Sequence, residues 1–221
     1  MTQNAEQVFI ELCDQAGIRW RRIPTAEKDR EKRPDYEIEV SGNYVVVEVK
    51  QFDPNREEKK ALADLEKQHF AAFPTRKPGG RVRKAIDKAA PQLKALSKGK
   101  LPTVVAVLSN VLDSHVDPYD IMTAMKGLDT VPVTVPKDSN VQPSFGDPKS
   151  GPDKRMTTNH NTTISAVAVI RKAPEAGYVL DVYHNNFAAN PIDPAWLRRP
   201  DIRHWKIPEG SASSLISWES I

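Results

Sequence analysis

The sequence contains very little cysteine: Cys13 is the only one among 221 residues. A single cysteine excludes an intrachain disulfide framework and a zinc site built from several cysteines. No stretch approaches the roughly 18 consecutive apolar residues that a membrane-spanning helix needs. The first residues also lack the basic and apolar segments that are typical of a signal peptide. We therefore expect a cytoplasmic protein without a membrane segment.

The motifs of several common enzyme classes are missing as well. No Gly-x-Ser-x-Gly elbow of a serine hydrolase is present. No two of the five histidines are three or four positions apart, as they are in helical zinc motifs. The remaining composition is 39% hydrophobic and 28% charged, which is enough apolar material for one domain with a core. We expect residues 1–221 to form that single domain.

The formal net charge of +3 hides an uneven distribution. Residues 76–100 contain nine Lys and Arg side chains and a single acid, Asp87. Such a block favours a surface that binds a polyanion. A charge run by itself is also typical of a solvated helix face. The charge alone therefore does not decide between the two, and the neighbouring elements have to be considered.

Hydrophobic periodicity predicts an α/β protein with a mixed sheet and helices on its faces. The predicted order is a helix at 4–17, a strand at 18–23, a charged loop at 25–33, a hairpin at 35–50, helices at 56–72 and 81–98, and a strand at 102–108. Pro91 should kink or split the helix at 81–98. The crossover from the hairpin to the strand at 102–108 is long enough for parallel pairing. Residues 110–163, with a helix from Asp117 to Met125, are predicted as an insertion or lid, and residues 164–221 as additional strands with a wrapping tail.

The hairpin places acidic side chains together. A two-residue turn at Ser41-Gly42 puts Asp35 opposite Glu48, and a turn at Gly42-Asn43 puts Glu37 there instead. A three-residue turn would separate the acids. Two carboxylates facing each other on a sheet repel, and either Lys50 or a divalent cation would offset that repulsion.

Oxygen ligands suit a particular kind of cation. Two carboxylates and a backbone carbonyl, such as that of Val49, favour Mg²⁺ or Mn²⁺. Such an ion can lower the pKa of a bound water and neutralise charge on a phosphoryl group. Lys50 lies two residues after Glu48 on the same strand face and could act on the attacking water or the phosphate.

These residues resemble a known signature. Pro34-Asp35, followed by twelve residues and then Glu48-Val49-Lys50, is similar to the signature of the PD-(D/E)XK nucleases. The predicted order over residues 4–109 resembles the α-β-β-β-α-β core of that superfamily. The resemblance implies a restriction-endonuclease-like fold and metal-dependent cleavage of phosphodiesters.

The resemblance also implies roles for individual residues. Asp35 and Glu48 would be metal ligands and Lys50 the catalytic lysine, and an acid on the first helix would complete the site. Glu11 matches that acid best, and Glu6 is the alternative. Gln92 lies on the helix that follows, but residue 96 is Leu, so the Gln-x-x-x-Tyr pattern of the RecB-like branch is missing.

The basic helix at 81–98 would flank this site and bind the nucleic-acid backbone. The expected phosphate contacts are Arg81, Arg83, Lys84 and Lys88. The turn Pro78-Gly79-Gly80, just before the helix, is a second and weaker candidate for a phosphate.

The sequence therefore predicts a Mg²⁺-dependent or Mn²⁺-dependent nuclease whose substrate is DNA and whose cleavage is endonucleolytic. Two alternatives stay open. One is a non-catalytic module of the same fold that binds nucleic acid or protein. The other is a nuclease subunit that needs a partner protein. A homodimer is compatible with cutting two strands, although no interface motif is present in the sequence.

Overall fold

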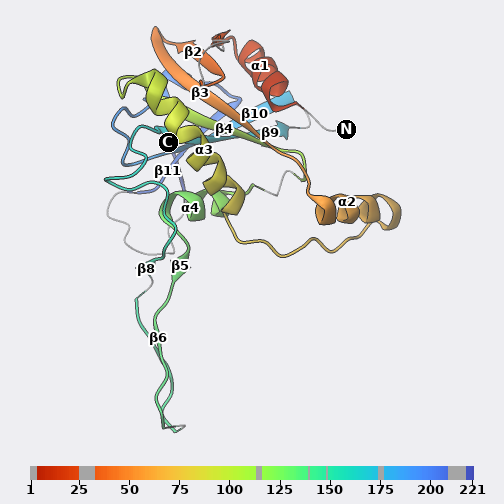
Figure 1. The fold of residues 1–221 in the computed structure, drawn as a ribbon, viewed down its shortest axis with the longest axis vertical. Helices are drawn as coiled ribbons and strands as arrows, with labels where there is room; N and C mark the ends of the chain where they lie inside the picture. Colours follow the sequence, from red (N-terminus) through yellow and green to blue (C-terminus); the bar gives the residue numbers. More distant parts are fainter. Residues whose placement is uncertain are drawn as a thin grey trace.

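The computed structural model describes residues 4–24, 33–112, 116–138, 140–147, 149–173, 177–208 and 218–221. Its centre is one mixed sheet of eight strands in the order β1-β2-β3-β4-β9-β10-β11-β12 (Figure 1). These strands are β1 (Arg19–Arg22), β2 (Tyr36–Val40), β3 (Asn43–Phe52), β4 (Thr103–Ser109), β9 (Ala166–Ala173), β10 (Gly177–His184), β11 (Ile202–Lys206) and β12 (Glu219–Ser220). The helices are α1 (Ala5–Gln15), α2 (Arg56–Gln68), α3 (Gly80–Ser97), α4 (Pro118–Lys126) and the short 3-10 helix η2 (Pro194–Leu197). The expected α/β class with a mixed sheet is confirmed, whereas the loop predicted at 25–33 lies almost wholly outside the described residues.

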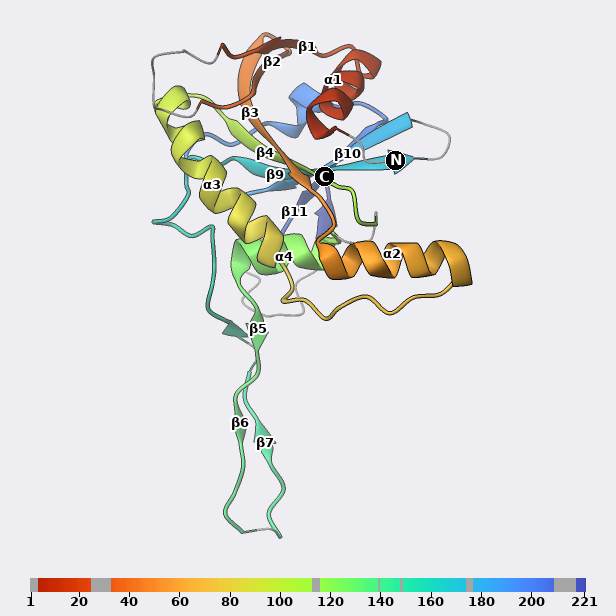
Figure 2. The ribbon, with the colours of Figure 1, turned by 45° about the vertical axis from the view of Figure 1, so that its right-hand side comes forward.

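Helices cover both faces of this sheet (Figure 2). Alternation along β3 sends Val45, Val47 and Val49 to the face covered by α1, and sends Val46 to the face covered by α3 and α4. Each face is closed by its own apolar cluster. Glu48 and Lys50 follow the alternation of Val46, so both side chains lie on the α3 side of β3.

The middle of the sheet is parallel. β3 pairs in parallel with β4, and β4 pairs in parallel with β9. The crossover that was predicted between the hairpin and the strand at 102–108 is therefore present, with α2 and α3 inside it. β4 is buried along nearly its whole length, as expected for a Val-rich strand covered on both faces.

Of the two effects expected of Pro91, the split is absent, because α3 runs through Pro91 as one helix. Pro91 and Asp87 are both exposed, so water can satisfy the Asp87 carbonyl that the proline leaves without a helical donor. The wrapping tail, predicted from His184 to Pro208, also contributes β11, which pairs in parallel with β10. This strand has only five residues, too few for a clear alternation pattern.

The predicted insertion contains α4 and a long two-stranded arm that extends away from the sheet (Figures 1 and 2). We call residues 129–150 the arm; its strands are β5 (Asp129–Thr130), β6 (Val133–Thr134), β7 (Ser144–Phe145) and β8 (Lys149–Ser150). β5 pairs with β8 and β6 pairs with β7, both antiparallel. The base of the arm is held to α4, where the Arg155 amide donates to the Ala124 carbonyl at 3.1 Å.

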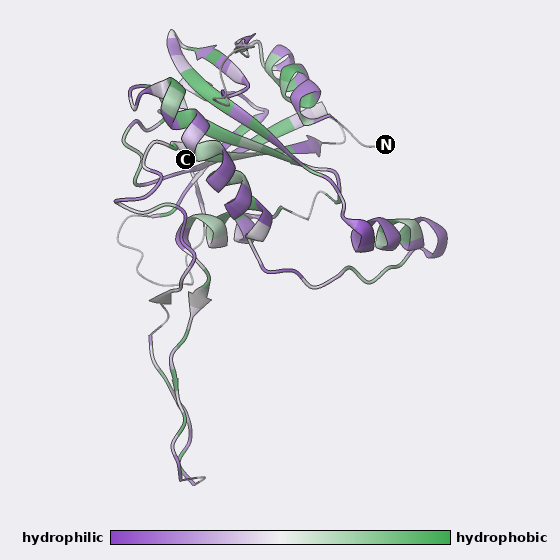
Figure 3. Cartoon of the chain, viewed as in Figure 1, coloured by the Kyte–Doolittle hydropathy of each residue, from purple (hydrophilic) through white to green (hydrophobic). Residues whose placement is uncertain are grey.

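Hydropathy follows this architecture (Figure 3). The central strands are coloured as hydrophobic, and α2, which projects from the side of the sheet, is largely hydrophilic. Among the described residues, no helix combines the length and the apolar character needed to cross a membrane.

Candidate active site on the β2–β3 hairpin

The turn of the hairpin decides the register of the acids. β2 and β3 pair with Val40 opposite Asn43 and Tyr36 opposite Val47. The two turn residues are Ser41 and Gly42, with φ angles of 51° and 76°. Two successive positive φ angles are typical of the type I′ turn, whose twist suits an antiparallel hairpin. Of the registers considered from the sequence, the one with the turn at Ser41-Gly42 is confirmed.

This register places Asp35, which directly precedes β2, opposite Glu48. The Asp35 carboxylate accepts a hydrogen bond from the Val49 amide, with 2.7 Å between Oδ2 and the nitrogen. The N–H and C=O of one strand residue project toward the same neighbouring strand. The Val49 carbonyl therefore points to the side of β3 on which Asp35 lies.

Glu48 is a buried carboxylate whose two oxygens have different surroundings. Its side chain is 1% exposed, and Oε1 forms an ion pair with the Nζ of Lys50. Oε2 is buried and has no hydrogen-bond partner among the described residues. A buried acceptor without a donor costs free energy, and a cation bound at that position would remove the cost.

The surroundings of Asp35 and Glu48 disfavour the charged forms of both carboxyls. Burial raises the pKa of Glu48, and the negative charge of Asp35 raises it further, while the bond to Lys50 opposes both effects. Burial also raises the pKa of Asp35, against the opposing effects of the Val49 amide and Lys50. Both upward shifts mean that the charged forms of the two carboxyls are disfavoured, and positive charge bound between them would favour those forms.

The first helix brings Glu6 to this site. The charge of Glu6 raises the pKa of Asp35, and Glu6 Oε2 accepts a hydrogen bond from the Tyr36 hydroxyl at 3.0 Å. The same oxygen forms an ion pair with Arg22 at 2.6 Å. Glu6, the alternative named from the sequence, is therefore the acid of α1 beside Asp35.

Glu11, the acid preferred from the sequence, lies elsewhere on the helix. It is exposed and accepts a hydrogen bond from Gln7 at 3.2 Å. Five positions along an α-helix turn a side chain by about 140°, so Glu6 and Glu11 cannot face the same site. The preference for Glu11 is not supported, because motif spacing alone did not show which side of the helix meets the hairpin.

Gln92 of α3 approaches the acids from above the sheet. Its Nε2 donates to the Arg33 carbonyl at 3.0 Å, just before Pro34 and Asp35. The same side chain lies near enough to Glu48 to lower the pKa of that carboxyl. The sequence assigns no role to Gln92, whereas in the structure its side chain tethers the segment that carries Asp35.

The basic helix presents only part of its charge. Lys84 and Lys88 are exposed, and they precede Gln92 by two turns and one turn along the same side of α3. Arg81 forms an ion pair with Glu58 of α2, and the Arg81 side chain is 27% exposed. Lys84 and Lys88 therefore remain the better placed of the expected phosphate contacts.

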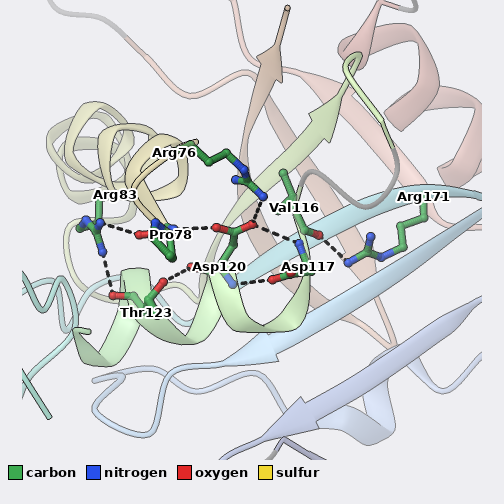
Figure 4. Close-up of polar contacts among 9 residues, drawn as sticks. Arg76, Pro78, Arg83, Val116, Asp117, Asp120, Thr123 and Arg171 are labelled. Carbon is green, nitrogen blue, oxygen red and sulfur yellow. Dashed lines mark hydrogen bonds and ion pairs between the residues drawn. The ribbon is translucent and has the colours of Figure 1, made fainter. Parts of the chain in front are cut away.

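The prediction that Arg83 contacts phosphate is wrong. The residue is 5% exposed, and its guanidinium donates to the Thr123 carbonyl at 2.9 Å and to the Pro78 carbonyl at 2.7 Å (Figure 4). Arg83 thus joins α3 to α4 instead of facing solvent. The sequence could not show this, because an arginine on a basic helix gives no sign of buried carbonyl partners.

The turn before α3 is also occupied. The Gly79 amide donates to Asp120 Oδ1 at 2.7 Å, and Arg76 forms an ion pair with Asp120 Oδ2 at 2.6 Å (Figure 4). Asp120 is buried and belongs to the capping box of α4. The weaker prediction, a phosphate bound at Pro78-Gly79-Gly80, is therefore wrong, because a carboxylate of the protein already binds that amide.

Within the part of the chain that the structure describes, no three His, Cys, Asp or Glu side chains form a ready-made metal group. The candidate ligand set is two carboxylates and one backbone carbonyl. Comparison of the chain with protein-family models, with curated proteins and with solved structures found no match. The function is therefore argued from the geometry of Asp35, Glu48 and Lys50.

Proposed function

We propose that this protein is a metal-dependent nuclease with a restriction-endonuclease-like fold that hydrolyses phosphodiester bonds, with DNA as substrate and endonucleolytic cleavage. One observation carries the proposal: the buried Glu48 has an oxygen without a hydrogen-bond partner in the described part of the chain, lies opposite Asp35 and forms an ion pair with Lys50. A purely structural role would leave the buried Oε2 of Glu48 as a cost to stability that the ion pair of Oε1 with Lys50 does not remove. Such costs are typical of functional sites.

The donor set fits a hard divalent cation. Asp35, Glu48 and the Val49 carbonyl would hold Mg²⁺ or Mn²⁺, because these ions prefer oxygen ligands and keep several waters. When bound, the ion would lower the pKa of a water and neutralise charge on the scissile phosphate. The raised pKa values of both carboxyls agree with this role, since a cation would favour their charged forms.

The side chains of the protein would then have separate roles. The Lys50 ammonium would turn from Glu48 toward the phosphate and stabilise the negative charge that develops on its oxygens. Gln92 would hold the segment preceding Asp35, so that the carboxylate stays opposite Glu48. Lys84 and Lys88 would bind backbone phosphates without reading base sequence.

The test is a cleavage assay on supercoiled plasmid, linear duplex, single-stranded DNA and RNA, each with Mg²⁺, Mn²⁺ or EDTA. We expect metal-dependent cleavage of DNA that is lost in Lys50→Ala and in Glu48→Gln. Glu37→Gln is the matched control, because Glu37 lies on the same strand face two residues from Asp35 and is paired with Arg21. Equal cleavage by native protein and Lys50→Ala would contradict the proposal.

The alternatives give different results in a second measurement. Calorimetric titration with Mn²⁺ should show saturable binding that Glu48→Gln abolishes. A non-catalytic module of the same fold should show neither metal binding nor cleavage. Metal binding without cleavage of any polymer would instead favour a subunit that needs a partner protein.

A further inference from the structure

The arm takes no part in the proposed nuclease site, and its register gives it two different faces. Val133 pairs with Phe145, and Thr134 pairs with Ser144. The Gly146 amide also donates to the Pro132 carbonyl at 2.8 Å, which extends the same register toward the base. Residues two apart on an extended strand share a face, and directly paired residues share a face.

The pairing places Val133 and Phe145 on one face of the arm. A period of two residues extends that face to Val131, Val135 and Val141. We call these five residues the arm's apolar face, and they are 46–72% exposed. The opposite face carries polar side chains, among them Thr134, Gln142 and Ser144. Alternation of this kind is typical of a ribbon with one face buried and the other in water.

The apolar face is large for a surface left in water. The five residues expose on the order of 500 Å², which is in the upper part of the range for the largest apolar patch of a typical monomer, and such a patch is often functional. A two-stranded ribbon is also marginally stable in water unless a further layer covers it. The arm thus has the composition of a structure that is completed by a partner.

Charge favours protein over nucleic acid as that partner. Residues 131–136 and 140–146 contain no charged side chain. A nucleic-acid arm would need Lys or Arg along its length to neutralise phosphates, whereas residues 131–146 contain one lysine, Lys137, next to one acid, Asp138. The surface that fits an uncharged Val and Phe face is another uncharged apolar face.

A second copy of this chain supplies such a face with matching charge. In a twofold arrangement the same patch meets itself, and two antiparallel arms would bring the tip of each arm to the base of the other. Lys137 is exposed at the tip, beside the exposed Asp138, and Asp147 is exposed toward the base. Lys137 continues the alternation of Val133 and Val135, whereas Asp138 follows that of Thr134. The antiparallel pairing would therefore set Lys137 of each copy against Asp147 of the other.

We propose that two copies of this chain form a dimer by packing the apolar faces of their arms against each other, antiparallel about a twofold axis near Val133. Two faces of this size bury about 1,000 Å² in total, near the lower limit for a specific interface. The dimer should therefore dissociate on dilution. The inference does not depend on the nuclease proposal, because no residue of the arm belongs to that site.

The test measures the mass of the native protein by light scattering and sedimentation from about 1 to 200 µM, a range that covers the weak affinity of a small interface. We expect a shift from monomer to dimer across this range. Val133→Asp combined with Phe145→Asp should give monomer throughout. Thr134→Asp combined with Ser144→Asp is the matched control, because it places the same charges on the opposite face and should leave the dimer intact.

Cross-linking tests the geometry. Cys13 is buried, and burial raises its pKa to about 12, so an introduced cysteine would be the reactive thiol. Val133→Cys should form a disulfide-linked dimer on oxidation, and Thr134→Cys should not. Lys137→Glu should weaken the dimer several-fold, and adding Asp147→Lys should restore it.

Three results would overturn the proposal. The first is a native protein that is monomeric at all concentrations, which would leave the arm to a different partner. The second is equal loss of the dimer in both aspartate pairs. The third is equal cross-linking through Val133→Cys and Thr134→Cys.

Discussion

Replacing Glu48 by Gln should stabilise the metal-free protein while abolishing its activity. The native carboxylate is buried, repelled by Asp35 and left with an oxygen that has no donor among the described residues. An unsatisfied buried acceptor costs about 1–3 kcal/mol. Glutamine removes the charge, keeps an oxygen for Lys50 and adds an amide that can donate toward Asp35. We expect a gain of about 1–2 kcal/mol in the free energy of unfolding, or several degrees in Tm.

The gain should depend on pH in a defined direction. Burial raises the pKa of Glu48 in the folded state above its value in the unfolded chain. The native protein therefore loses stability as pH rises from the unfolded pKa through the folded one, and it recovers that stability when Glu48 is protonated at low pH. The advantage of Glu48→Gln should be largest near pH 7–8 and should fade toward about pH 4.

Urea denaturation in EDTA across this pH range is the assay, with Glu37→Gln as control. Glu37 pairs with an exposed arginine, so its replacement should change stability by less than about 1 kcal/mol. Adding Mg²⁺ should stabilise the native protein and the Glu37→Gln control but not Glu48→Gln, because a ligand stabilises only a folded state that binds it. A variant less stable than the native protein at pH 7.5 in EDTA would refute the reasoning.

Other parts of the structure give further predictions. Gly79→Ala should lower the free energy of unfolding by about 3 kcal/mol or more, measured by urea denaturation. Gly79 has φ +68°, and an added Cβ would lie 2.7–2.8 Å from backbone atoms of α4. Gly80→Ala is the control: its Cβ would meet open space, so the change should be neutral or stabilising. Burial lowers the pKa of His184 to about 4, so stability should fall by up to about 3 kcal/mol as pH drops from 6.5 to 4, and a variant His184→Gln should flatten that fall. Lys84→Ala and Lys88→Ala should each reduce the salt dependence of DNA binding by about 0.9 in the slope of log K against log salt, measured by anisotropy; an unchanged slope would remove α3 from the interface.

The hairpin shows what the sequence could establish about the site. Its turn has only a few acceptable geometries, and each one fixes the pairing of every residue behind it. Asp35 and Glu48 could therefore be placed face to face as one of three alternatives. The strong alternation of the strands also made the two faces of β3 predictable.

Interactions between distant elements were harder to predict. The choice between Glu6 and Glu11 could not be made from the sequence, because the rotation of α1 against the hairpin depends on tertiary packing. The burial of Arg83 could not be predicted, because its partners are backbone carbonyls, those of Pro78 before α3 and Thr123 of α4. β11 was missed because parallel pairing with β10 is non-local and the strand is short.

The central position of β4 has a consequence for synthesis. β4 pairs with β3 on one edge and with β9 on the other, and residues 110–165 separate β4 from β9 in the chain. At typical translation rates the ribosome needs about 3–10 s to make that stretch. During this interval a Val-rich strand has one unpaired edge on the nascent chain, which is a typical start for aggregation. The yield of folded protein should therefore respond strongly to growth temperature and to chaperones that bind nascent chains.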